Sequence, residues 1–306
     1  LDKFVTASAA RCSILELGRL GEDQTALIVN DYLGAPCDEP ALIRRIHAMA
    51  DGTPLGVLEV LGAFLDGGVL RPHGRMWQVD VGRADQVTLP EGSLAFLGRR
   101  LEELPVATQR VLETAAIIGR SFDLEFLSVV TGLSPDDLQY AISAAKRAGL
   151  LERVDRQLYA FVHDSLREML SERLGDAQRQ ELNQQVAEAL EATGDESVDN
   201  LCATATHYAE GQPEKDPLRS LRAATRAMHA VLDRFDNERA LRFFKQANDA
   251  ASHARIELGA EHFSAAGEAY LRLGALHESR AAFESALAKA KSNTVRAKTL
   301  GRIAWV

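Results

Sequence analysis

The chain has 306 residues, a formal net charge of −9 and a sequence pI of about 5.5. An acidic protein of this kind is not suited to generic nucleic-acid binding through a basic field. The length is enough for two or three domains with a sizeable core. No run approaches the roughly 18 apolar residues that a membrane helix needs, so we expect no membrane partner.

The N-terminus and the cysteines bear on the cellular compartment. The first residues form too short an apolar region for a signal peptide. Cys12, Cys37 and Cys202 are odd in number, far apart and in no metal-binding spacing. They predict ordinary buried thiols in a reducing, cytoplasmic environment. Because the first residue is not methionine, we expect the chain to be a fragment.

The first part of the chain predicts a strand at residues 12–17, followed by a helix at 22–33. The sequence contains no Gly-x-x-x-x-Gly-Lys-Ser/Thr phosphate loop. It also lacks an apolar strand that ends in paired acids, of the kind that holds Mg²⁺ in phosphoryl-transfer enzymes. On its own the chain is therefore expected not to hydrolyse ATP.

Residues 42–67 predict two helices that meet at a tight corner. Gly52 suits the end of the first helix, Thr53 can cap the second, and Pro54 fits its first turn. The second helix is predicted to present an apolar stripe, which consists of Leu55, Leu58, Leu61 and Leu65. Taken alone, this pattern is a plain helix–turn–helix corner.

A hairpin around residues 72–74 and a helix through Phe96, Leu97 and Leu101 follow this corner. Arg99 and Arg100 on that helix are candidates for phosphate contact. A solvated helix face is the favoured interpretation for both arginines.

Residues 104–172 fit a winged helix. One helix is marked by residues 111–118, a second by 122–130, and a third is capped by Ser134. Residues 150–154 and 158–162 then predict a β-wing with its turn at 155–157. A DNA-binding interpretation would use basic residues on the third helix, Lys146 and Arg147, but acidic residues at its start and the net charge oppose it.

The wing leads directly into a helix at His163. The N–H groups at a helix start attract anions, and an adjacent imidazole can donate one more hydrogen bond to a phosphate oxygen. Asp164 is a candidate N-cap, and Ser165 and Glu168 have capping-box spacing. The alternative is that His163 merely packs at the end of a strand.

From residue 173 the sequence is alanine-rich and helical throughout. The segments Phe244-x-x-Ala247 and Phe283-x-x-Ala286 repeat 39 residues apart. Around the second segment, the spacings of a tetratricopeptide unit are matched by Gly267, Tyr270, Gly274, Phe283 and Ala286. Ser279 stands where alanine is usual. A generic helical bundle is the alternative.

Two further expectations concern this helical region. His207, Tyr208 and His229 lie on apolar helix faces and predict core or rim residues rather than ligands. Without a capping helix, Ile303, Ala304 and Trp305 would be exposed, so we expect the repeats to continue in the parent protein.

Two of these motifs together resemble a known pair. Gly52-Thr53-Pro54 and, about a hundred residues later, Val162-His163-Asp164 resemble motifs of the STAND-class signal-transduction ATPases, which include NB-ARC proteins and bacterial regulators. Those proteins carry Gly-x-Pro in a helical lid and a Met-His-Asp-like motif in the winged helix that follows. Val162 replaces the usual methionine.

A second set of motifs extends the resemblance. Bacterial proteins of this class often have a Leu-Pro, a helix with Arg-Leu and another Leu-Pro. The order here is Leu89-Pro90, Arg100-Leu101 and Leu104-Pro105.

The resemblance implies a nucleotide site for ATP or ADP, with Mg²⁺ in the parent protein. The residues that it assigns to the nucleotide are Gly52, Pro54, Leu55 and His163. Pro54 would lie against the adenine, and His163 would face the β-phosphate of ADP.

The predicted fold is mainly α. Residues 1–20 would end an ATPase core, 21–103 would form a helical lid, 104–172 a winged helix, and 173–306 tetratricopeptide-like repeats. The resemblance implies the sensor portion of a regulatory ATPase, in which the lid and winged helix grip ADP or ATP and the repeats bind a protein partner.

The parent protein would control transcription or the activity of an attached cyclase or kinase domain. The resemblance is also compatible with a parent protein that forms a homo-oligomer. Direct DNA contact by this chain is not expected. The alternatives are a non-catalytic scaffold with a degenerate lid and a DNA-binding transcriptional regulator.

Overall fold

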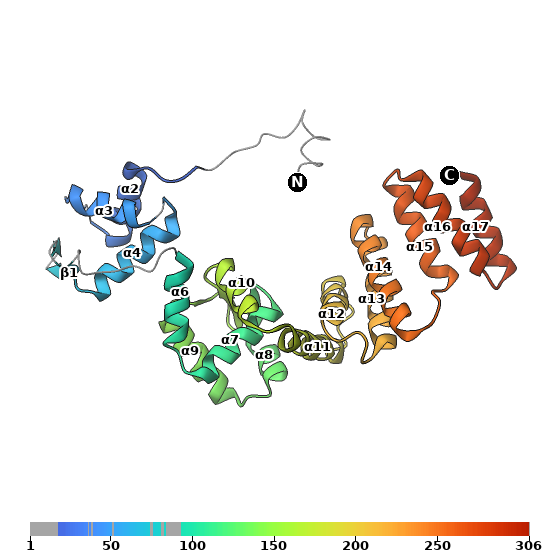
Figure 1. Cartoon of the computed structure of the whole chain (residues 1–306), viewed down its shortest axis with the longest axis horizontal. Helices are drawn as coiled ribbons and strands as arrows, with labels where there is room; N and C mark the ends of the chain where they lie inside the picture. Colours follow the sequence, from blue (N-terminus) through green and yellow to red (C-terminus); the bar gives the residue numbers. More distant parts are fainter. Residues whose placement is uncertain are drawn as a thin grey trace. The chain divides into compact units, whose positions relative to one another are not determined.

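The computed structural model describes residues 18–35, 37, 39–50, 52–73, 76–80, 83 and 93–305, with the backbone alone at 66, 76 and 93–96. As predicted, the fold is mainly α-helical (Figure 1). The chain divides into two compact units, Leu1–Glu103 and Leu104–Val306. The predicted strand at 12–17 and the Leu89-Pro90 motif lie outside the described residues.

The first unit is a small helical body with one hairpin. Its elements are α2 (Glu22–Leu33), α3 (Pro40–Met49), α4 (Pro54–Asp66), β1 (Leu70–His73), β2 (Met76–Val79) and α6 (Ser93–Glu102). The predicted helix at 22–33, the corner and the hairpin are all confirmed. Buried apolar side chains of α2, α3 and α4 form one core, to which the hairpin adds Leu70. The indole of Trp77 donates a hydrogen bond to the Leu33 carbonyl (2.9 Å) and so ties the hairpin to α2.

The predicted leucine stripe of α4 is partly wrong. The buried face consists of Val57, Val60, Leu61 and Phe64, whereas Leu58 is 38% exposed. Glu59 and Asp66 are the only charged residues of this helix, so its sequence has little polar contrast to mark a solvent side.

Within the described residues no single helix is long and apolar enough to span a bilayer. The helices α3 and α4 reach the required length and composition only when they are taken together, and this pair is bent by 119°.

The second unit begins with a winged-helix arrangement. Its elements are α7 (Val106–Ile118), β3 (Ser121–Asp123), α8 (Leu124–Thr131), α9 (Pro135–Arg147), β4 (Leu151–Arg153), β5 (Leu158–Phe161) and α10 (Asp164–Arg173). The antiparallel sheet has the order β3-β5-β4. The predicted wing is therefore confirmed, and Ser134 caps α9 by accepting a hydrogen bond from the Asp137 N–H.

The second predicted helix of this region starts later than expected. Phe122, predicted to be helical, lies in β3 opposite Tyr159 and packs against Tyr159 and Phe161 in the sheet. Asp123 then caps α8, because its carboxylate accepts hydrogen bonds from the N–H groups of Glu125 and Phe126. Pairing with a distant strand overrides the local helical pattern here.

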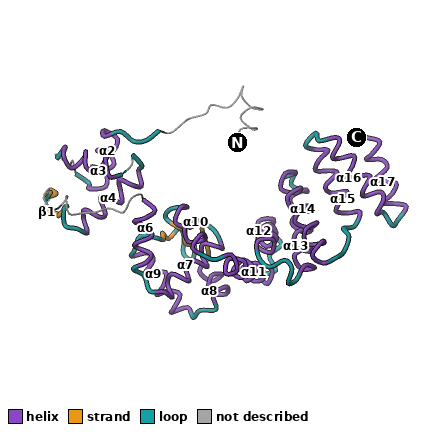
Figure 2. Tube along the Cα trace, in the orientation of Figure 1, coloured by secondary structure: helices purple, strands orange, loops and turns teal. Residues whose placement is uncertain are grey.

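The rest of the second unit consists of antiparallel helix pairs followed by one last helix (Figure 2). They are α11 (Asp176–Ala192), α12 (Val198–Glu210), α13 (Pro217–Leu232), α14 (Asn237–Ala254), α15 (Ala260–Arg272), α16 (Leu276–Lys289) and α17 (Asn293–Trp305). The pairs are α11–α12, α13–α14 and α15–α16. The two Phe-x-x-Ala segments lie on α14 and α16, the second helices of their pairs, as the repeat interpretation predicts.

The α15–α16 pair shows why small residues are needed where helices meet. A Cβ atom at Gly267 would lie 2.8 Å from the ring of Phe283, so only glycine permits this approach. Ser279 replaces the usual alanine without cost, because its buried hydroxyl donates to the Gly267 carbonyl (2.9 Å). Phe283 is buried as predicted, whereas Tyr270 is only half-buried.

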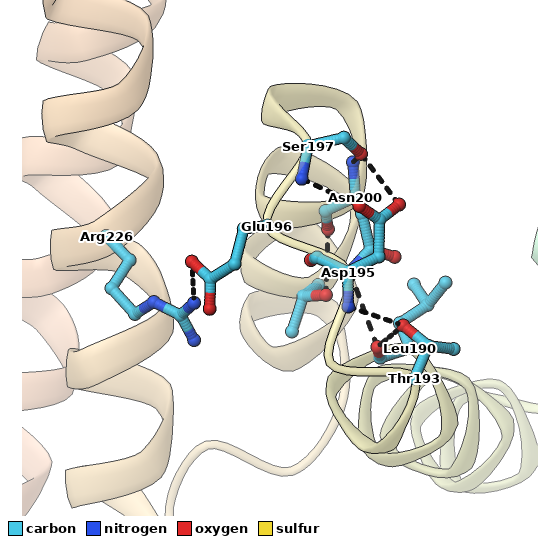
Figure 3. Close-up of polar contacts among 8 residues, drawn as sticks. Leu190, Thr193, Asp195, Glu196, Ser197, Asn200 and Arg226 are labelled. Atoms are coloured by element: carbon cyan, nitrogen blue, oxygen red, sulfur yellow. Dashed lines mark hydrogen bonds and ion pairs between the residues drawn. The ribbon is translucent and has the colours of Figure 1, made fainter.

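The loop between α11 and α12 is held by side-chain contacts (Figure 3). The carboxylate of Asp195 accepts hydrogen bonds from the N–H and the hydroxyl of Ser197, both at 2.8 Å. Asn200 donates to the Asp195 carbonyl (2.8 Å). Next to them, Glu196 pairs with Arg226 of α13 at 2.5 Å. The loop therefore has a defined conformation and is attached to the following helix pair.

A polar cluster crosses from α11 to α12 and α13. The hydroxyl of buried Tyr208 donates to Glu191 (2.7 Å), and the same carboxylate accepts from Arg219. His207 lies beside this cluster and bonds Asn183 through Nδ1 (2.8 Å). His207 and Tyr208 are thus packing residues, as predicted. Of the cysteines, Cys202 is buried, and burial raises the pKa of its thiol, while Cys37 is half-buried.

His207 predicts a pH-dependent stability. Burial lowers its pKa to about 4, below that of an exposed histidine, so the unfolded chain takes up the proton first. The stability that neutral, buried His207 contributes is therefore fully present above about pH 6.5 and is lost as the pH falls below that value. Between pH 7 and pH 5 we expect a loss of about 1–2 kcal/mol from this group. Urea unfolding of the parent and of His207→Gln should show a shallower pH slope in the variant; equal slopes would contradict the prediction.

Candidate functional site

The corner between α3 and α4 has the geometry that its sequence predicts. Gly52 has φ +65° and is buried, and its carbonyl accepts from the Leu20 N–H (2.8 Å). Thr53 caps α4 by accepting a hydrogen bond from the Gly56 N–H (3.0 Å). Pro54 is the first residue of α4 and is exposed, while Leu55 is half-buried. The corner therefore presents Pro54 to solvent on a rigid support.

A residue that the sequence analysis did not single out holds this corner together. A Cβ atom at Gly56 would lie 2.2 Å from the Ala50 carbonyl oxygen, which is backbone and cannot move aside as a side chain can. The N-terminus of α4 therefore crosses directly over the end of α3. The only sequence signal for this is a glycine where a helix former would be more stable.

We expect Gly56→Ala to destabilise the first unit by about 1–3 kcal/mol through overpacking. Gly62→Ala on the same helix is the matched control, because there the nearest atom is the flexible end of Arg100 at 3.4 Å. Gly62→Ala should be neutral or stabilising, since alanine is the better helix former. Thermal melts of both variants test this, and equal effects would exclude close packing at Gly56.

His163 occupies the N-cap of α10, directly after β5, and is half-buried. Within the described part of the chain its imidazole makes no hydrogen bond. Burial lowers the pKa of His163, and the nearby Glu152 carboxylate opposes this shift. Among the described residues the imidazole therefore has no hydrogen-bond partner, and it lies next to the N–H groups at the start of α10.

The predicted cap by Asp164 is wrong. Residue 163 already has the extended N-cap conformation, so Asp164 is the first helical residue. Its carboxylate instead accepts from the Arg167 guanidinium (3.1 Å). Asp164 thus contributes a negative charge in the first turn, which suits the helix dipole.

The four predicted nucleotide residues fall in two different units. Gly52, Pro54 and Leu55 belong to the first and His163 to the second, and their contact with one nucleotide stays a prediction.

The two arginines of α6 differ from each other. Arg99 is solvated and pairs with Glu103 (3.8 Å), as predicted. Arg100 is half-buried near Glu59 of α4, so the solvated interpretation is wrong for this residue. Burial raises the pKa of Glu59 to about 7, with Arg100 opposing the shift.

The described residues contain no cluster of three or more His, Cys, Asp or Glu side chains that could hold a metal ion.

The DNA-binding interpretation would use basic residues on α9. The first turn of this helix carries Asp136 and Asp137, and the ammonium of Lys146 lies 5.9 Å from the ring centre of Tyr159 in the wing of the same domain.

A second candidate site is a groove along the first helices of the repeat pairs. Its volume is about 570 Å³. Its lining residues come mainly from α13, α15 and α17 and are His229, Leu232, Glu261, Ser264, Ala265, Glu268, Arg272, Phe283, Val295, Lys298, Thr299 and Arg302. His229 is exposed at this groove, a rim position as predicted.

Charged side chains on the groove wall are linked to one another. Glu268 of α15 pairs with Arg272 and with Arg302 of α17, each at 3.1 Å. Arg272 also donates to the Leu232 carbonyl at the end of α13 (2.9 Å) and stacks over the ring of Phe235. The groove thus combines an apolar floor with charges of both signs.

No protein-family model matches the sequence, and a search of curated proteins finds no match. Among solved structures, the chain is similar to a Signal Transduction ATPase with Numerous Domains (STAND) protein with a tetratricopeptide repeat sensor, from Pyrococcus horikoshii. The identity is 13% and the TM-score 0.43, over 95% of this chain and 44% of that chain. This chain therefore spans less than half the length of that protein.

Proposed function

We propose that residues 176–305 are a protein-binding sensor and that the groove on α13, α15 and α17 receives a segment of a partner protein. The observation that carries the proposal is the groove itself, about 570 Å³ in volume, with an apolar floor and charged walls. Such a surface suits a peptide with one aliphatic or aromatic anchor flanked by charged residues. Stacked helical repeats provide extended surfaces of this kind.

The wall of the groove favours recognition over catalysis. Glu268 and Arg272 are held by several partners, so their charges are fixed before a ligand arrives. A preformed charge pattern lowers the entropic cost of binding and selects partners of complementary charge.

A second proposal concerns the nucleotide. We propose that the lid corner at Gly52, Pro54 and Leu55 and the imidazole of His163 grip ADP or ATP in a larger regulatory ATPase, and that the repeats relay a signal to them. The motif pair, the exposed Pro54 and the uncommitted ring of His163 support this role. The residues of this chain would bind and sense the nucleotide, and none of them would perform its hydrolysis.

A peptide library displayed on phage and selected against the 306-residue chain tests the first proposal. Ser264→Trp places a bulky side chain in the groove and should weaken the selected peptides at least tenfold. Ser285→Trp is the matched control, since Ser285 is a half-buried serine on α16 that does not line the groove. Peptides that bind both variants equally would show that the groove is not the binding surface.

A further inference from the structure

A second cavity of about 340 Å³ lies between α12, α13 and α14. Its lining residues are Ala205, Ala209, Pro213, Ser220, Ala224, Gln246, Asp249, Ala250, Ser252 and His253. The peptide groove uses His229 and Leu232 of α13, whereas this cavity uses Ser220 and Ala224, which lie on a different side of the same helix. The two sites are therefore separate surfaces of the repeat region.

Two buried polar atoms on the wall of this cavity have no partner within the described residues. They are Oγ of Ser220, a residue that is only 5% exposed, and Oε1 of Gln246. Thr225 of the same helix shows the usual solution, since its hydroxyl donates to the Leu221 carbonyl (2.7 Å), but Ser220 makes no such bond. Nearly all buried polar groups in folded proteins are hydrogen-bonded. Two exceptions that line one cavity make it a candidate binding site.

The lining residues define the chemistry of that ligand. An amide oxygen such as Oε1 of Gln246 can only accept a hydrogen bond, so the ligand must carry a donor. Among the described residues that line the cavity, Asp249 is the one carboxylate, and none is a lysine or an arginine. Gln246 and Asp249 are three residues apart on α14 and so share a helix face.

The size and the walls restrict the ligand further. The volume lies near the lower end of the roughly 300–1,000 Å³ range of small-molecule pockets. Alanine methyl groups from all three helices form part of the remaining surface, with Pro213, Ser252 and His253, and these methyl groups suit a short alkyl chain.

We propose that this cavity binds a small aliphatic amine. Its ammonium group donates hydrogen bonds to Oε1 of Gln246 and to the Asp249 carboxylate, its alkyl chain lies against the alanine methyl groups, and a polar group at its far end reaches the Ser220 hydroxyl. The site is independent of the peptide groove and of the nucleotide, and it gives the repeat region a small-molecule input of its own.

Calorimetric titration of the 306-residue chain tests the proposal with three probes of similar length, namely 1,4-diaminobutane, butane-1,4-diol and succinate. We expect the diamine to bind one-to-one and at least tenfold more tightly than the diol or succinate. Ser220→Ala and Gln246→Leu should each weaken the diamine at least tenfold. Asp249→Asn should remove the preference for diamine over diol.

Ser285→Ala and Asp233→Asn are matched controls, because neither residue lines the cavity or the groove. Asp249 is itself exposed, so Asp249→Asn is expected to fold even if a variant at a buried position does not. Absence of binding by all three probes would mean that water fills the cavity and would overturn the proposal. A preference for succinate, or diamine binding that none of the cavity variants weakens, would overturn it as well.

Discussion

Replacing Phe283 by alanine should lower the free energy of unfolding by about 3–5 kcal/mol, the usual cost of removing a fully buried phenylalanine. Phe283 is 2% exposed, and its ring lies directly against Gly267 on the neighbouring helix. The glycine cannot fill the space that the ring leaves, so a cavity would remain between α15 and α16. Such a loss is a large fraction of the 5–15 kcal/mol that stabilises a typical domain.

Urea unfolding followed by circular dichroism measures this effect. Leu276→Ala on the same helix is the control, because Leu276 is 51% exposed and its truncation should change stability by less than about 0.5 kcal/mol. If Phe283→Ala unfolds at the same urea midpoint as the parent, the repeat interpretation of this helix pair is wrong.

Replacing His163 by alanine should loosen ADP by roughly ten- to a hundredfold in the full-length protein that contains this chain. The expectation rests on the proposed nucleotide site. The phosphate of ADP would lose the hydrogen bond that the imidazole donates, which is worth about 1.5–3 kcal/mol if the ring is charged. Because this contact would be made mainly in the closed state, the variant should also shift toward the open, signalling form without any input.

ADP release and thermal melting should be measured side by side for His163→Ala. His277→Ala, at an exposed position on α16, controls for the loss of an imidazole as such. A histidine that only packs at the end of β5 would give a different result, namely lower stability with an unchanged rate of ADP release. That outcome would remove His163 from the nucleotide site.

Local signals made much of this fold predictable from the sequence. Thr53 and Ser134 cap helices where their sequence positions predict, and α2 has the predicted bounds. The errors occur where distant segments decide the structure. Phe122 joins a strand because β5, about 40 residues later, pairs with it, and Leu58 faces solvent because the packing of α2 and α3 selects the buried side of α4.

The candidate sites follow the same division. The corner at Gly52 and Pro54 is a local pattern and was predictable, whereas the close contact at Gly56 depends on how two helices cross. The peptide groove and the cavity at Ser220 are formed by side chains from several helices. Single positions in such sites look like ordinary helix residues, so the sequence gives no signal for them.

The ion pairs of Glu268 have a mechanical consequence. Through Arg272 and the Leu232 carbonyl, α15 is attached to the end of α13, while through Arg302 it is attached to α17. The attachment to the α13 end consists of two contacts, both made by Arg272, whereas the attachment to α17 through Glu268 is a single ion pair. A partner whose cation replaced Arg302 at Glu268 would remove this ion pair to α17 and would leave both contacts of α15 with the end of α13 in place.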